Sequence, residues 1–241
     1  MNLVLFDAEE IRQDGSVEAL AERARHLTTV LRVHRDQQVR IGLIDGPLGV
    51  GTVTAIDAGR VTLQCTFDRD TPQRPAVDLL LALPRPKVMR RLWAQLAALG
   101  VGQVILTNAE KVERDYFDTH LLRPEGYRPL LVEGLQQARD TRLPIVSVHK
   151  QFRKLIESDL NILFPAGHRI VAHPGGEQSI SAVLGETPGR VLLAVGPEGG
   201  WNDFELSLLQ SHGFAPVTMG PRTLTTTTAC IALLTLVHSR S

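Results

Sequence analysis

Between Val77 and the end of the chain, short apolar runs alternate with longer segments of helical composition. The apolar runs have the length and composition of buried parallel strands, and they occupy residues 79–83, 104–107, 145–148, 170–172, 191–195 and 216–219. The helical segments between and after them occupy residues 87–99, 124–139, 152–160, 203–211 and 226–238. This alternation predicts an α/β domain of βαβ type.

The chain before this domain has a different rhythm. It contains β-like runs at residues 39–44, 49–56 and 60–67, separated by the turn signals Asp45-Gly46-Pro47 and Asp57-Ala58-Gly59. This spacing is typical of a small antiparallel barrel. Residues 68–75 are polar and contain two prolines, so they form a linker or a covering loop. We therefore predict two domains, residues 1–72 and residues 73–241.

Composition excludes several classes of protein. Hydrophobic residues make up 43% and charged residues 22% of the chain, and the formal net charge is zero, so the chain is globular and carries no overall positive charge. Cys65 and Cys230 are its only cysteines, which gives neither a disulfide framework nor a zinc site. No apolar stretch approaches the roughly 20 residues that span a bilayer, and the start of the chain lacks a basic signal-peptide region. We expect a soluble cytoplasmic protein with no metal and no membrane contact.

A glycine-rich loop follows the apolar run at residues 191–195. It reads Gly196-Pro197-Glu198-Gly199-Gly200, and Asn202 or Asp203 then offers a cap for the next helix. Glycines let backbone amides approach a ligand, and ligands of open α/β sheets bind beyond the carboxyl ends of the strands. The loop is neither a Walker loop nor a dinucleotide fingerprint. It predicts a cofactor pocket, with a connection that binds no ligand as the alternative.

Two further strands end in similar loops, Met219-Gly220-Pro221-Arg222 and His173-Pro174-Gly175-Gly176. We expect the three loops to converge on one site. His173 is either a base or a turn residue. Glu198 either orients a substrate amine or a proton, or binds the amides of its own loop.

Two local basic clusters contrast with the neutral total charge. The first contains the single acid Asp36 and consists of Arg23, Arg25, Arg32, Arg35 and Arg40 with His26 and His34. The second contains no acid and consists of Arg85, Lys87, Arg90 and Arg91. Either cluster suits phosphate contacts or is a solvated charged face. The presence of one cluster in each predicted domain favours RNA binding.

Taken together, these elements resemble the small-subunit (16S) ribosomal RNA uridine methyltransferases known as methyltransferase E, in the SPOUT superfamily. The resemblance covers nearly the whole chain and includes His26-Leu27, Leu99-Gly100-Val101, the segment QARDTRLP at residues 137–144, His173-Pro174, Gly196 to Gly200, and Met219 to Arg222 with Leu224, Thr226, Thr228 and Ala229. The order of the GPEGG and MGPR elements is its most specific part.

The resemblance implies a fold and a reaction. The fold is an N-terminal PUA-like RNA-binding β-barrel followed by a SPOUT α/β domain with a C-terminal deep trefoil knot, and the protein is a homodimer. The reaction is methylation of the imino ring nitrogen (N3) of a uridine in 16S ribosomal RNA, within the small subunit or a precursor. S-adenosylmethionine is the methyl donor, and its electrophilic sulfonium carbon requires no metal.

The resemblance also assigns roles to residues. The donor would be held by His173, Pro174, Gly196, Pro197, Glu198, Gly199, Gly200, Met219, Gly220 and Leu224. Arg222 would contact the target nucleotide or its phosphate, and Glu198 would handle the proton. RNA would be bound by Arg23, Arg25, Arg32, Arg35, Arg85 and Lys87.

The chain departs from the family pattern at one place near this predicted site. Where the family usually has Arg-Thr-Glu-Thr-Ala, this chain has Thr225-Thr226-Thr227-Thr228-Ala229. The segment around residues 136–140 also differs from the common Glu-Gln-x-Gly-Arg form. A catalytically weak SPOUT relative that acts as an RNA-binding ribosome assembly factor is therefore an alternative. A nucleotide-dependent oxidoreductase is a third hypothesis, against which the missing dinucleotide spacing argues.

Overall fold

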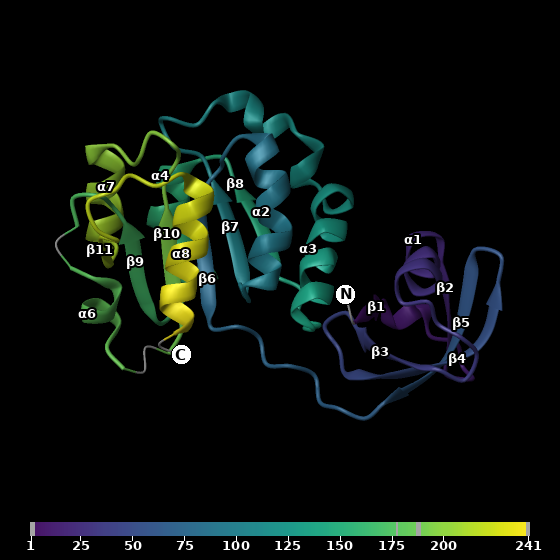
Figure 1. Cartoon of the computed structure of the whole chain (residues 1–241). Coiled ribbons are helices and arrows are strands. Elements are labelled where there is room, and N and C mark those ends of the chain that lie inside the picture. The colour runs from purple at the N-terminus through teal and green to yellow at the C-terminus, as the bar shows by residue number, and fades with distance from the viewer. Residues whose placement is uncertain (1–2, 177, 187–188, 240–241) are drawn as a thin grey trace. The chain divides into compact units, whose positions relative to one another are not determined.

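The computed structural model describes residues 3–176, 178–186 and 189–239 (Figure 1). The chain folds into two compact units. The N-terminal unit contains Met1–Arg74 and Val132–Leu143, and the C-terminal unit contains Pro75–Leu131 and Pro144–Ser241. The first change of unit lies two residues from the predicted boundary, whereas the return of Val132–Leu143 to the N-terminal unit has no counterpart in the prediction.

The N-terminal unit is built on a five-stranded mixed sheet. Its strands, in spatial order, are β1 (Val4–Phe6), β3 (Gln38–Leu43), β4 (Leu48–Asp57), β5 (Arg60–Phe67) and β2 (Ser16–Leu20). β1 pairs parallel to β3, and the other neighbours are antiparallel. The predicted antiparallel barrel is therefore wrong in two respects. One pair is parallel, and in the described part of the chain β1 and β2 are the two edges of an open sheet.

A short helix covers the hydrophobic core of this unit. α1 (Ala21–Arg25) continues as the π-helix η2 (His26–Val30), and it packs Ala24 and Leu27 into a cluster with Phe6, Val61 and Leu63. In β5 the buried side chains alternate with exposed ones, as expected for a strand with one face on a core. The 3-10 helix η1 (Ala8–Glu10) connects β1 to β2.

The C-terminal unit contains a six-stranded sheet whose neighbouring strands all pair in parallel. Its spatial order is β11 (Phe214–Val217), β9 (His168–Ala172), β10 (Val191–Val195), β6 (Val77–Ala82), β7 (Gln103–Thr107) and β8 (Ile145–His149). Every apolar run predicted in this part of the chain forms one of these strands. The last strand begins earlier than predicted, so Thr218 and Met219 belong to the loop after it.

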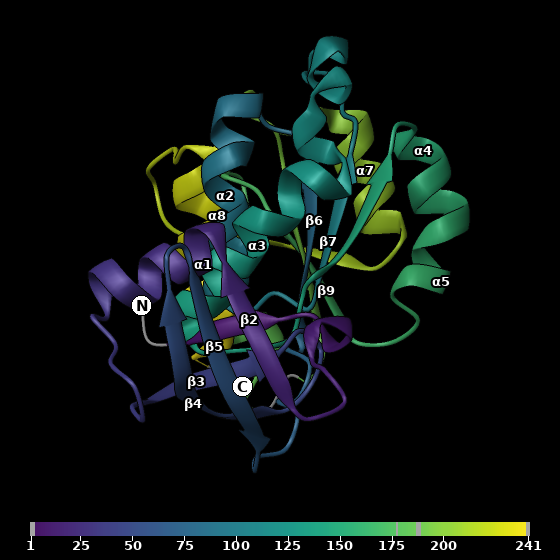
Figure 2. The same ribbon diagram turned by 90° about the vertical axis from the view of Figure 1, so that its right-hand side faces the viewer.

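Helices cover both faces of this sheet (Figure 2). α2 (Pro86–Ala98) and α8 (Thr226–His238) contact each other on one face. The other face carries α7 (Asp203–Ser211) and a continuous helical segment made of α4 (Phe152–Lys154), η5 (Leu155–Asp159) and α5 (Leu160–Leu163). The remaining helices are α3 (Pro124–Ala138), α6 (Ile180–Leu184), η3 (Arg114–Asp118) and η4 (His120–Leu122). None of the helices in the described residues has the length and apolar character needed to cross a membrane.

The core of the C-terminal unit explains the sequence pattern. All five residues of β10 and all six of β6 are buried, because each strand has a neighbour on both sides and helices on both faces. Trp93 is fully buried, as predicted, and its Nε1 donates to the Leu121 carbonyl at 3.1 Å. Cys230 is also buried as predicted, in α8.

Candidate functional site

Three loops of the C-terminal unit meet around one cavity of about 200 Å³. They follow β9, β10 and β11, and the last residues of these strands, Ala172, Val195 and Val217, line the cavity. The predicted convergence of the three loops is therefore found. All residues predicted to hold the donor line this cavity, as does Arg222.

The loop after β10 needs its glycines for steric reasons. A Cβ at Gly196 would lie 3.1 Å from the indole nitrogen of Trp201, which is 5% exposed and packs its ring 5.3 Å from that of Phe152. Gly200 has φ +71° and donates to the Pro197 carbonyl at 2.8 Å, which closes a turn. The main chain of this loop consequently lies open to the cavity with few side chains in the way.

A buried carboxylate fixes the end of this loop. Glu205, which is 3% exposed, accepts from the Asn202 amide at 2.9 Å, while Asn202 accepts from the Glu205 amide at 2.8 Å. This reciprocal pair is a capping box that starts α7. The other oxygen of Glu205 accepts from the Glu110 amide at 2.7 Å. The sequence analysis proposed Asn202 or Asp203 as the cap, but it missed Glu205 three residues later.

The loop after β9 shows His173 as a turn residue. Its Nδ1 accepts from the Gly175 amide at 3.1 Å, and its carbonyl accepts from the Gly176 amide at 3.0 Å. The His173 amide donates to the Val217 carbonyl at 3.0 Å, which ties this loop to β11. The geometry agrees with the turn hypothesis, because the ring orders its own loop at the cavity wall.

The loop after β11 carries the exposed side chain of Arg222. Thr218 Oγ1 accepts from the Gly220 amide at 3.2 Å, and Gly220 has φ +100°, a conformation that favours glycine. Arg222 and Glu198 are both exposed at the cavity, where their charges are accessible to a ligand.

The threonine run starts helix α8. Thr225 is the N-cap, and its hydroxyl accepts from the Thr228 amide at 3.3 Å and lies 3.0 Å from the Thr228 hydroxyl. Thr226 is buried and lines the cavity together with Ala229. The threonines that replace the usual charged residues therefore have a local role, since they cap the helix that closes the cavity.

The residues predicted to bind RNA differ in how strongly the fold engages them. Arg23 donates to Glu10 at 2.9 Å and to the Leu5 carbonyl at 3.1 Å, and its guanidinium lies 4.8 Å from the centre of the Phe6 ring. Arg25 is mostly exposed and lies 3.6 Å from Glu22. The remaining predicted residues are exposed, namely Arg32, Arg35, Arg85 and Lys87.

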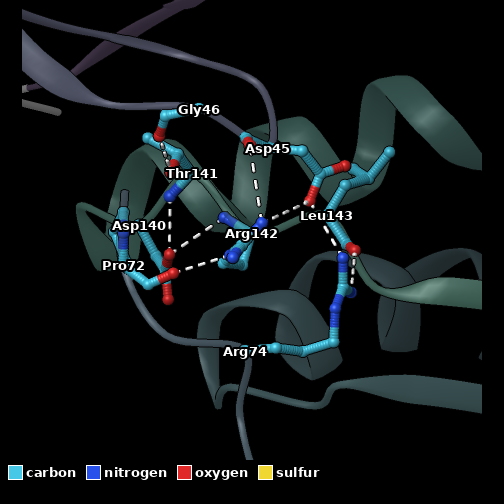
Figure 3. A network of polar contacts seen from close by, with 8 residues as sticks. All are labelled: Asp45, Gly46, Pro72, Arg74, Asp140, Thr141, Arg142 and Leu143. Carbon is cyan, nitrogen blue, oxygen red and sulfur yellow. Dashed lines mark hydrogen bonds and ion pairs between the residues drawn. The ribbon is translucent and has the colours of Figure 1, made fainter. Parts of the chain in front are cut away.

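The segment QARDTRLP, which contributed to the family resemblance, is a structural element of the N-terminal unit (Figure 3). Arg142 Nε donates to the Pro72 carbonyl at 2.6 Å, and Thr141 Oγ1 donates to the Gly46 carbonyl at 2.7 Å. Arg74 donates to Asp45 at 3.1 Å and to the Leu143 carbonyl at 2.8 Å. These bonds hold residues 140–143 against the turn between β3 and β4 and against the polar segment at residues 68–75.

No group of three or more His, Cys, Asp or Glu side chains within the described ranges is arranged to hold a metal ion.

Comparisons with known proteins support the division of the chain. Residues 71–238 match the family described as RNA methyltransferase domain, and residues 21–64 match the RNA methyltransferase PUA domain. A ribosomal RNA small subunit methyltransferase E from Treponema pallidum is 30% identical over 242 residues, which cover 98% of this chain and 90% of that protein. The ribosomal RNA small subunit methyltransferase E 1 of Borreliella burgdorferi is 22% identical over 240 residues, 100% of this chain and 98% of that protein.

The fold also matches solved structures. A ribosomal RNA small subunit methyltransferase E from Neisseria gonorrhoeae, bound to S-adenosyl methionine, aligns with a TM-score of 0.80 at 20% sequence identity. The alignment covers 99% of this chain and 97% of that structure.

Proposed function

This chain belongs to the ribosomal RNA small subunit methyltransferase E family, and we propose that it transfers a methyl group from S-adenosylmethionine to the imino ring nitrogen (N3) of a uridine in 16S ribosomal RNA. The observation that carries this proposal is the convergence of the loops after β9, β10 and β11 on one cavity. That cavity lies at the carboxyl edge of a parallel sheet, where α/β proteins bind their ligands. The Neisseria gonorrhoeae relative with the same fold is bound to this donor.

The cavity suits the donor chemically. Val195, Val217 and Leu224 offer apolar contacts for an adenine ring and a thioether chain, and the glycine loops offer main-chain amides and carbonyls for the polar edges. The backbone at Gly196 is close to the cavity because Trp201 occupies the space that a Cβ would fill. When bound, S-adenosylmethionine supplies an electrophilic methyl carbon on its sulfonium.

The residues of the chain would then act mainly by positioning. The loops fix the donor, and the basic residues fix the RNA, so that the two reacting atoms meet in line. The uridine nitrogen must lose its proton before it can accept the methyl group. We assign Glu198 to accept that proton and Arg222 to stabilise the negative charge on the uracil ring, because both are exposed at the cavity.

RNA binding is assigned to the exposed basic residues. Phosphate contacts require accessible guanidinium or ammonium groups, a condition met by Arg25, Arg32, Arg35, Arg85 and Lys87. Arg23 is left out of this set because Glu10 and the Leu5 carbonyl already engage its guanidinium. The RNA methyltransferase PUA match at residues 21–64 supports an RNA-binding role for the N-terminal unit.

The family resemblance carries the remaining parts of the proposal. We propose a homodimer, a cytoplasmic location, and a SPOUT domain with a deep trefoil knot in its C-terminal loops. The domains would be residues 1–72 and residues 73–241, with residues 132–143 completing the first. The substrate would be 16S RNA within the small subunit or a precursor.

Methyl transfer to small subunits tests the proposal. Purified chain is incubated with labelled S-adenosylmethionine and with subunits from a strain that lacks the modification, and the RNA is digested to nucleosides for mass spectrometry. We expect N3-methyluridine, and we expect Arg222→Ala to reduce its formation with little change in donor affinity. Methylation of another base would refute the assigned nitrogen.

A catalytically weak assembly factor is the second candidate, favoured by the threonines at positions 225 and 227. Donor binding and RNA binding without methyl transfer would establish it. Calorimetry with S-adenosylmethionine and with NAD separates both candidates from an oxidoreductase, which would bind NAD instead.

A further inference from the structure

A fourth loop contacts the donor loop from outside the cavity. It comprises residues 108–112, directly after β7, and its Lys111 Nζ donates to the Gly199 carbonyl at 2.7 Å. The stem of the lysine lies against the same glycine, because a Cβ at Gly199 would be 2.6 Å from Lys111 Cδ. The ammonium and the stem therefore grip one peptide unit of the donor loop.

A second contact joins the same two loops. The Glu110 amide donates to Glu205 at 2.7 Å, and the other oxygen of Glu205 accepts from Asn202 at 2.9 Å. Glu205 is 3% exposed, so this bridge is shielded from water. Glu110 and Lys111 are adjacent in sequence, and they hold the end and the middle of the donor loop respectively.

We propose that Lys111 is a positioning residue of the methyl-donor site, which acts by fixing the Gly199 peptide before the donor arrives. This inference rests on the proposed function. Gly199 and Gly200 have no side chains to anchor them, so without Lys111 the loop samples more conformations, and donor binding must then order it. A loop that is already ordered binds its ligand more tightly because that entropic cost is reduced.

Lysine suits this position for two reasons. Its ammonium is a strong donor to a carbonyl, and its flexible stem covers the glycine without closing the cavity on the other side. Arginine at position 111 retains a cationic donor and a long stem, so it should preserve most of the effect. Methionine retains the stem but removes the hydrogen bond.

The first test measures donor affinity by calorimetry. We expect Lys111→Met to weaken S-adenosylmethionine binding about twofold to tenfold, the range of one net hydrogen bond, and Lys111→Arg to restore most of it. Lys154→Met is the matched control, since Lys154 is also exposed in the C-terminal unit but belongs to α4. The control should bind as the wild type does.

A double-mutant cycle tests whether the contact itself matters. In Gly199→Ala the new methyl group displaces the lysine stem, and in Lys111→Ala the stem is absent, so both changes should weaken binding. If they act through the same contact, the double variant binds about as well as the weaker single variant. Full multiplication of the two effects would overturn the proposal.

Hydrogen exchange without the donor gives an independent readout. We expect faster exchange of the amides of residues 198–201 in Lys111→Met and unchanged exchange in α2. Wild-type affinity in Lys111→Met overturns the inference and leaves the proposed function intact. A wild-type chain that does not bind S-adenosylmethionine overturns the proposed function, and with it the donor role of Lys111, whatever the exchange data show.

Discussion

Replacing Glu205 with glutamine should destabilise the C-terminal unit. Both carboxylate oxygens accept backbone amides, Oε1 from Glu110 at 2.7 Å and Oε2 from Asn202 at 2.9 Å. Glutamine has one oxygen, so its NH₂ group must face one of these amides and leave a buried donor unsatisfied. Such a group costs about 1–3 kcal/mol, which in a unit of this size lowers Tm by about 2–12 °C.

The assay is thermal unfolding followed by circular dichroism, with Asp203→Asn as the control. Asp203 lies in the same first turn of α7 but is exposed, so its substitution removes only the favourable charge at the helix start, worth about 0.3–1 kcal/mol. Glu205→Gln should also weaken S-adenosylmethionine binding, because the donor loop ends at Asn202. Equal destabilisation by the two substitutions would refute the bridge and leave only a helix-charge effect.

Other predictions concern RNA, protons and thiols. The RNA affinity of a triple alanine variant should fall and its log–log salt slope should flatten by about 0.7–0.9 per lost phosphate contact; an unchanged slope would mark a solvated face, and the residues replaced are Arg25, Arg32 and Arg35. Burial lowers the pKa of His238 below 6.5, so the unfolded chain binds the proton first and the free energy of unfolding should decrease as pH falls below 6.5, an effect that His238→Gln should reduce in denaturant titrations. Burial raises the pKa of Cys65 to about 11 and that of Cys230 to about 12, so a thiol reagent at pH 8 should label both only after unfolding. Thr225→Arg should cost about 0.5–2 kcal/mol in thermal unfolding through loss of the α8 cap, and unchanged stability would argue against the cap.

The strands of the C-terminal unit could be predicted because burial on both faces leaves a plain mark in the sequence. β10 is apolar at every position, so no register or partner is needed to recognise it. β1 and β2 of the N-terminal unit were missed for the opposite reason. β1 has three residues, too few to show a period, and both strands depend on distant partners, β3 and β5.

The site divides in the same way. The loops after β9, β10 and β11 could be predicted to converge because parallel strands end at one edge. Lys111 could not be found, since its role depends on where the loop after β7 lies relative to Gly199. Glu205 was readable as the third residue of a capping box after Asn202, but its bond to Glu110 was not. In the basic cluster, Arg23 could not be distinguished from Arg25 without its partner Glu10, thirteen positions away.

The return of Val132–Leu143 to the N-terminal unit determines when that unit can be completed during synthesis. At least 143 residues must leave the ribosome before Thr141 can bond to Gly46 and Arg142 to Pro72. Until then the nascent chain holds an N-terminal sheet whose β3–β4 turn lacks these partners, while β6 and β7 have already emerged. A fragment cut after Arg74 would remain in that unfinished state permanently, so an isolated RNA-binding domain needs residues 132–143 supplied as a covalent graft or a separate peptide.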